Sequence, residues 1–339
     1  MSLVSTSPKK FLTLDEQIEL LCGRGMVPSH DIKQWLHSVN YYRLSGYWHT
    51  YRVLESDGSG VVRRAERFIE GTSFTTIETL YEFDRKLRTL VHDGIERVEV
   101  ALRSHLSYVL GASSPIAHTD RSYFRDGFDH ETWMKNASSR VDRAARRSPV
   151  IAHHREKYGG VIPIWVLVDV LDFSDLSMLF DGMRAADQFA VAERLGIIID
   201  PARLKPNQAV RAKKNHPLAR WFEQLTVLRN IGAHHGRMWN RTLIPTSTAA
   251  LRTVEGLQLL PRGQSEQLFG GLTLIAKLLG TASPGSTWAH KVRGEIEHVY
   301  SELPDRSERE MGFPEDWRAM TLWSNDKPAT APSRRSLGD

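Results

Sequence analysis

The longest regular pattern in the chain is an apolar repeat with steps of three and four residues, the period of one helix face. It begins near Thr76 and continues to Leu106, so we predict a long helix that ends at Gly111. Shorter segments with this period predict further helices at residues 14–23, 31–39, 131–158, 163–183 (one helix or two), 248–257, 265–279 and 287–302. Strand patterns are few, and residues 63–74 leave a short strand and a loop both open. The fold class that follows is mainly α.

A second pattern runs from Leu218 to Arg241, where an apolar helix face gives way to a polar cluster. The apolar positions Leu218, Trp221, Phe222, Leu225 and Leu228 have the spacing of one buried face. The next thirteen residues contain seven side chains that can transfer a proton or bind phosphate: Arg229, Asn230, His234, His235, Arg237, Asn240 and Arg241. We therefore examine this stretch as a candidate active site.

Composition limits the class of protein. The 339 residues include 41% apolar and 25% charged residues, an ordinary globular balance. The longest apolar runs fall short of the roughly 20 residues of a membrane span, and the N-terminus lacks an apolar signal-peptide core. Cys22 is the only cysteine, which excludes a disulfide within the chain and a four-cysteine zinc site. We expect a cytoplasmic protein with no cofactor and no membrane partner.

The charge is mildly basic. Lysine and arginine total 45 against 40 acidic residues, a formal net charge of +5. This excess permits an anionic partner without requiring one. Basic clusters at residues 63–67, 140–147 and 211–214 are most simply solvated helix faces.

Aromatic and basic residues alternate at residues 40–52. Tyr41, Tyr42 and Tyr47 with Arg43 could stack bases and hold phosphate. The structural alternative is an aromatic helix core with arginines that reach to solvent. Arg85, Arg88 and Arg103, on the polar side of the long helix, could line an RNA groove, or could form ordinary ion pairs one turn apart.

The residue types at 229–234 suit RNA cleavage without a metal. In that reaction the 2′-hydroxyl attacks the adjacent phosphate, so the enzyme supplies a base, an acid and positive charge. Histidine serves as acid or base because its ordinary pKa of about 6.5 lies near working pH. Arginine grips phosphate oxygens and stays charged, and asparagine can orient either group. Arg229, Asn230 and His234 supply these three parts, and a purely structural role for them remains the alternative.

Helical geometry constrains this site. At about 100° per residue, Asn230 and His234 share a face, whereas Arg229 and His234 lie about 140° apart. They converge if Arg229 reaches around the helix, if the helix loosens near Gly232, or if a second chain completes the site. A metal site is not expected, because residues 224–241 contain no cysteine and no carboxylate.

The segment RNIGAHH fits the R-x4-H motif of the HEPN superfamily of ribonucleases. The longer LRNIGAHHGRMWNR resembles the signature of Abi family proteins, of the AbiD and AbiF type. The segments NYYRLSGYWHTYR, IERVEVALRS, PIWVLVDVLDFSDLS and MGFPEDWRAMTLW also resemble family segments, in the same order. The resemblance covers about residues 10–323 and is weakest at residues 112–160.

The resemblance implies a HEPN-type helical bundle core with additional helices at both ends. It implies a metal-independent endoribonuclease of toxin type that acts in abortive infection, an antiviral defence. It places catalysis on Arg229, Asn230 and His234, with His235, Arg237 and Asn240 as auxiliary residues, and completes the site across a homodimer. RNA is the implied partner, as a target and in some relatives as a regulatory small RNA.

Four regions follow for the domain organisation. Residues 1–75 form a helical, basic and aromatic segment, and residues 76–302 form the HEPN-like core with a variable insertion at 112–160. Residues 303–323 form an ordered tail that packs on the body, and residues 324–339 a disordered tail rich in serine, proline and arginine.

Two other function classes stay open. A non-catalytic RNA-binding module would use the same basic site without cleavage, and a helical scaffold protein would have no affinity for RNA. Cleavage by variants of His234 distinguishes the nuclease from both.

Overall fold

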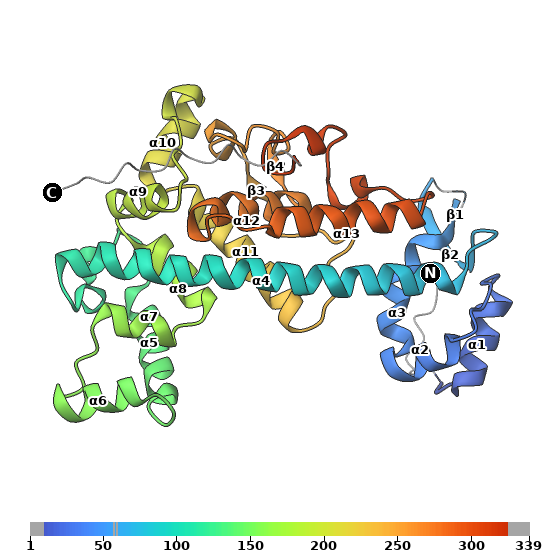
Figure 1. The fold of residues 1–339 in the computed structure, drawn as a ribbon, viewed down its shortest axis with the longest axis horizontal. Helices are drawn as coiled ribbons and strands as arrows, with labels where there is room; N and C mark the ends of the chain where they lie inside the picture. Colours follow the sequence, from blue (N-terminus) through green and yellow to red (C-terminus); the bar gives the residue numbers. More distant parts are fainter. Residues whose placement is uncertain (1–9, 57, 59, 325–339) are drawn as a thin grey trace. The chain divides into compact units, whose positions relative to one another are not determined.

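The computed structural model describes residues 10–56, 58 and 60–324, and within them the fold is mainly helical, as predicted (Figure 1). The tail predicted to be disordered, residues 324–339, lies outside the described residues apart from Ser324. The described residues divide into two compact units, one from residues 10–86 with 298–305 and one from residues 87–297 with 306–324. This division differs from the predicted boundary at residue 75, because the long helix α4 (Phe74–Ser113) contributes to both units.

The first unit contains three short helices and a β-hairpin before α4. The helices are α1 (Leu14–Gly23), α2 (Ile32–Val39) and α3 (Tyr41–Trp48). The hairpin pairs β1 (Arg52–Ser56) with β2 (Val62–Phe68) in antiparallel register, which decides the open choice at residues 63–68 in favour of a strand. Thr13 and Glu16 form the reciprocal capping box that starts α1.

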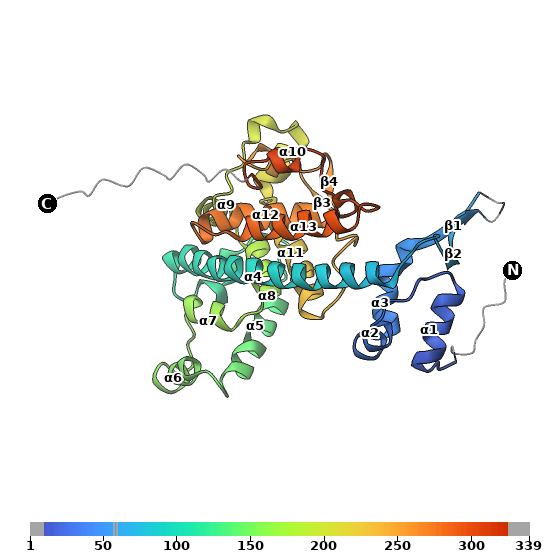
Figure 2. The same ribbon diagram turned by 45° about the vertical axis from the view of Figure 1, so that its right-hand side comes forward.

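The second unit is built from α4 after residue 86 and the helices that follow it. Their bounds are α5 (His130–Ala144), α6 (Pro149–Lys157), α7 (Ile164–Val170), α8 (Phe173–Gly182), α9 (Ala185–Arg194), α10 (Pro206–Lys214), α11 (Leu218–Ala233), α12 (Leu268–Ala282) and the start of α13 (Trp288–Glu302). Two residue pairs form the short ladder β3 (Thr246–Ser247) with β4 (Gln264–Ser265). Figures 1 and 2 show α12 running beside this part of α4.

Three predicted elements differ from the structure. The single helix at 131–158 is two helices, because Ser148 caps a new helix that begins with Pro149. The helix predicted at 248–257 is absent, and only the 3₁₀ turn Leu251–Thr253 forms there. Residues 114–129, for which the sequence predicted no helix or strand, contain two 3₁₀ turns and a bridge between Phe124 and Met183.

The C-terminal segment packs on the second unit through aromatic rings. Phe313, Trp317 and Trp323 are buried. Phe313 lies 4.8 Å from the ring of Phe269 on α12, and Trp323 Nε1 donates to Thr273 Oγ1 at 3.3 Å. Among the described residues, no helix is long and apolar enough to cross a membrane.

Gly94 lets α12 and α13 approach α4 closely. A Cβ atom at Gly94 would lie 2.7 Å from Ile275 Cγ2 and 2.8 Å from Trp288 Nε1. That indole nitrogen donates to Leu90 O at 2.6 Å, so the ring cannot move without losing this bond.

We expect Gly94→Ala to lower the free energy of unfolding by about 1–3 kcal/mol through overpacking, reduced by the ~1 kcal/mol gain in helix propensity. Urea denaturation measures the change. Gly111→Ala is the matched control on the same helix, because its Cβ would meet Ile164 and Trp165 at an ordinary 3.4 Å. Equal stability of the two variants would contradict the packing argument.

A second prediction concerns His216, which is buried before α11. Its Nδ1 accepts from the Leu218 N–H at 3.2 Å, and Nε2 has no partner among the described residues. Burial lowers the pKa of His216 to about 4. The unfolded chain therefore binds the proton first as pH falls below about 6.5, and stability drops between pH 6.5 and 4.

For His216 alone the loss between pH 7 and pH 5 is roughly 2 kcal/mol. We expect His216→Asn, which keeps an acceptor for Leu218, to be less stable at pH 7 because it loses ring packing, and to show a smaller fall towards pH 5. Urea denaturation of both proteins at the two pH values tests this. Parallel pH profiles would contradict it.

Candidate active site

The candidate site lies at the C-terminal end of α11, whose apolar face is wholly buried. The predicted face residues are each 0% exposed: Leu218, Trp221, Phe222, Leu225 and Leu228. The ring of Phe222 meets that of Phe180 on α8 at 5.1 Å, and Gly271 on α12 faces Leu228. This packing on two neighbouring helices fixes the axis of α11.

Hydrogen bonds also attach the following loop to α11. Trp221 Nε1 donates to Ser247 O at 3.1 Å. The buried amide of Gln224 donates to Ile244 O at 2.7 Å and to Ser265 O at 3.0 Å. These bonds hold the two strands of the short β3–β4 ladder against α11, on either side of residues 248–257, where a helix was predicted and only a 3₁₀ turn forms.

The helix ends in a Schellman motif. The N–H of Gly236 donates to Ile231 O at 2.7 Å, and that of His235 to Gly232 O at 3.0 Å. His235 takes the left-handed conformation usual for glycine at this position, with φ 56°. The motif fixes the backbone of His234, which is the C-cap residue.

Each catalytic candidate has a defined place at this end. Asn230 and His234 are exposed, and Arg229 is partly buried. Arg229 Nη1 lies 3.4 Å from Asn230 Oδ1 and donates to it. Among the described residues, no hydrogen bond or ion pair joins Arg229 to His234.

The structure removes one of the three ways in which Arg229 and His234 could converge. The helix does not loosen near Gly232, because α11 is regular to Ala233 and the N–H of His234 still donates to Asn230 O at 3.0 Å. The remaining ways are a long reach of the Arg229 side chain or a contribution from a second chain.

The auxiliary candidates surround this end. His235 is exposed, whereas Arg237 and Asn240 are partly buried. The guanidinium of Arg237 lies 6.0 Å from the ring centre of the buried Trp239, within cation–π range. Asn240 has φ 47°, a second left-handed turn that redirects the chain after the motif.

The predicted RNA contacts of the first unit differ in their access to solvent. Tyr42 is 67% exposed and Arg43 is also exposed, so both stay candidates for contact with RNA. Tyr41 is partly buried, and its hydroxyl accepts from Arg24 at 3.2 Å. Tyr47 is 1% exposed and donates to Asp84 Oδ2 at 2.7 Å, so its ring cannot stack a base in this fold.

The three arginines of α4 are also not equivalent. Arg85 is half exposed and pairs with Glu82 at 2.8 Å. Arg88 is buried. Arg103 pairs with Glu99 at 2.5 Å and donates to the carbonyls of Val168 and Leu171, both at 2.8 Å. Arg103 therefore holds the end of α7, and the burial of Arg88 leaves its guanidinium little access to RNA.

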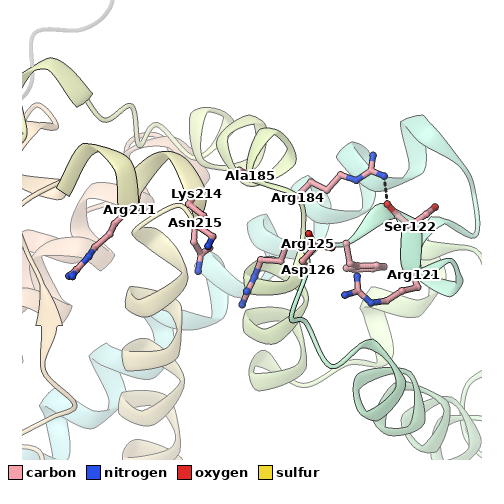
Figure 3. A pocket seen from close by; sticks show the side chains of 10 residues that line it. Arg121, Ser122, Arg125, Asp126, Arg184, Ala185, Arg211, Lys214 and Asn215 are labelled. Carbon is pink, nitrogen blue, oxygen red and sulfur yellow. Dashed lines mark hydrogen bonds between the residues drawn. The ribbon is translucent and has the colours of Figure 1, made fainter. Parts of the chain in front are cut away.

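Sequence patterns did not reveal a basic groove in the second unit, with a volume of about 920 Å³. Arg121, Arg125, Arg184, Arg211 and Lys214 line it (Figure 3). The only signal in the sequence is the cluster at 211–214, since the other cations come from separate segments that the fold brings together. No group of three or more metal-binding side chains lies together in the described part of the chain.

Comparison with known proteins places this site within a family. The family model described as Abi-like protein matches residues 34–240, more than half of the chain. The match ends at Asn240, so it includes the R-x4-H segment at residues 229–234 and leaves out Arg241. No curated protein and no solved structure matches the chain. The family match alone suffices to assign this chain to the Abi-like proteins.

Proposed function

We propose that this Abi-like protein is a metal-independent endoribonuclease of the HEPN type, whose active site contains Arg229, Asn230 and His234 and is completed in a homodimer. The observation that carries the proposal is the exposed His234 at a capped helix end, one turn after Asn230, whose side-chain oxygen accepts a hydrogen bond from the guanidinium of Arg229. Membership of the family indicates a role in abortive infection, and cleavage of RNA is one way to stop a host cell.

Arg229 and Asn230 have complementary roles in this proposal. The Arg229 guanidinium stabilises the charge that develops on the phosphate oxygens. The Asn230 amide oxygen, 3.4 Å from Arg229 Nη1, limits the directions in which the guanidinium points. The partial burial of Arg229 restricts its side chain before phosphate binds, so less conformational entropy is lost on binding.

Two histidines are needed for the full reaction. One neutral imidazole accepts the proton of the 2′-hydroxyl, and one imidazolium gives a proton to the leaving 5′-oxygen. Within one chain His235 has a left-handed backbone conformation, with φ 56°, whereas the φ of His234 is −92°. The two imidazoles of one chain therefore have different local geometry. Two copies of His234, one from each chain of a dimer, supply the base and the acid with the same local geometry.

We expect His234→Ala and Arg229→Ala each to lower RNA cleavage in EDTA by about 100- to 10,000-fold, the usual contribution of an acid–base or charge-stabilising group. Purified protein and a labelled RNA suffice for the assay. His153→Ala is the matched control, because it removes an exposed histidine of the same unit that lies on α6.

Equal cleavage by wild type, His234→Ala and Arg229→Ala would refute the catalytic assignment. Activity that disappears in EDTA and returns with a divalent metal would also refute it. RNA binding without cleavage by any version would identify the protein as an RNA-binding module instead.

The dimeric site has its own test. We expect wild type co-expressed with an equal amount of His234→Ala to keep about a quarter of the activity, because only about a quarter of randomly paired dimers contain two intact chains. A site complete within each chain would keep about half. Cleavage measured against the proportion of wild-type chain distinguishes a quadratic from a linear dependence, and a linear one would contradict the shared site.

A further inference from the structure

The basic groove of the second unit joins three segments. Arg121 lies in a 3₁₀ turn (Arg121–Tyr123), Arg125 follows it, Arg184 precedes α9, and Arg211 and Lys214 lie one turn apart on α10 (Figure 3). Phe124, which is buried, also lines the groove. Cations from such distant segments line one groove only because the fold assembles them.

Most of this charge is not neutralised by the protein. Arg125 pairs with Asp181 at 2.5 Å. Arg184 interacts electrostatically with Asp120 and Asp187 and donates to Ser122 O. Among the described residues, no ion pair joins a carboxylate to the three other cations, which are Arg121, Arg211 and Lys214. Asp126 is the single acidic residue in the lining. Like charges gathered in a concave surface raise the local positive potential and attract an anion.

The backbone around the groove is held in place before any ligand arrives. The carboxylate of Asp181 accepts hydrogen bonds from Arg125 Nη2 at 2.5 Å and from Asn215 Nδ2 at 2.9 Å. The N–H of Arg125 also donates to Gly182 O at 2.9 Å. These bonds tie the segment at 121–126 to the end of α8 and to the residue that follows α10, so little ordering is required on binding.

The position of the groove favours an extended anion over a small one. Asn215 lies three residues before the start of α11, and the motif lies at the other end of that helix. Sixteen residues of helix span about 24 Å at 1.5 Å per residue. A strand with regularly spaced phosphates can occupy both ends, and guanidinium groups match phosphate oxygens.

We propose that this groove binds the sugar-phosphate backbone of a single-stranded RNA, several nucleotides away from the bond cleaved at the Arg229–His234 site. That RNA is the polyanion rests on the proposed nuclease function, whereas the affinity of the groove for phosphates rests on its own charge and geometry. The groove sets affinity and strand placement, and the motif at the end of α11 performs the cleavage.

The test measures binding in the His234→Ala background, so that the RNA stays intact. The probe is a fluorescent, unstructured 20-nucleotide RNA. The groove variant Arg211→Glu/Lys214→Glu changes two exposed side chains on one face of α10, and circular dichroism checks its fold. The matched control Arg146→Glu/Arg147→Glu makes the same charge change at exposed positions of the same unit, outside the groove.

We expect the groove variant to bind the RNA about tenfold more weakly or worse at 0.1 M salt, since contacts to charged groups are the strong ones. The slope of log affinity against log salt should shrink by about 0.7 for each lost phosphate contact. The control should lose little affinity and keep its slope. Equal losses in both variants, or no loss in the groove variant, would overturn the inference.

Cleavage by the wild-type protein in EDTA is assayed separately, so the two proposals fail differently. Binding that survives the groove variant, with cleavage still dependent on His234, overturns the groove and leaves the nuclease standing. Groove-dependent binding without cleavage by any version supports the groove and rejects the nuclease.

Discussion

The burial of one face of α11 is the constraint on which the rest of the candidate site depends. Phe222 packs against α8, and Leu228 against the backbone of α12 at Gly271. With five large side chains fully withdrawn from water, the helix has a single rotational setting about its axis. The direction in which Asn230 faces solvent is therefore decided by hydrophobic packing two to three turns earlier in the chain.

The two proposed sites lie at opposite ends of α11. At its start, Asn215 and the buried His216 connect α10 to the end of α8 and to α9, where the cations of the groove converge. At its end, the Schellman motif fixes His234 in an exposed position. Recognition of phosphate and cleavage are proposed at opposite ends of one rigid rod, so neither requires the local structure of the other to change.

Local periodicity was sufficient to predict α4, α11, α12 and α13, because each buries a continuous apolar face. It failed at residues 248–257. The chain just before this segment is held to α11 by hydrogen bonds from Trp221 to Ser247 O and from Gln224 to Ile244 O. It also joined α5 to α6, although Ser148 and Pro149 form a helix start that can be read from the sequence. Failures of the first kind need the tertiary structure, whereas those of the second kind need closer attention to caps.

For the site, sequence located the motif but could not sort the residues around it. Tyr42 and Tyr47 lie in the same aromatic and basic stretch, yet one is exposed and the other donates to a buried carboxylate. Arg103 looks like a phosphate ligand until the carbonyls at the end of α7 are seen to occupy it. The groove was beyond sequence analysis because its cations are up to 93 residues apart, from Arg121 to Lys214.

Because α11 is regular up to its cap, the number of residues in the R-x4-H motif determines where the His234 imidazole lies relative to Arg229 and Asn230. One residue more or fewer between Asn230 and His234 would turn the imidazole by about 100° and shift it by about 1.5 Å along the axis. The cap at His235 prevents the chain from absorbing such a change by unwinding. The number of residues between Asn230 and His234 therefore fixes the direction of the imidazole relative to Asn230.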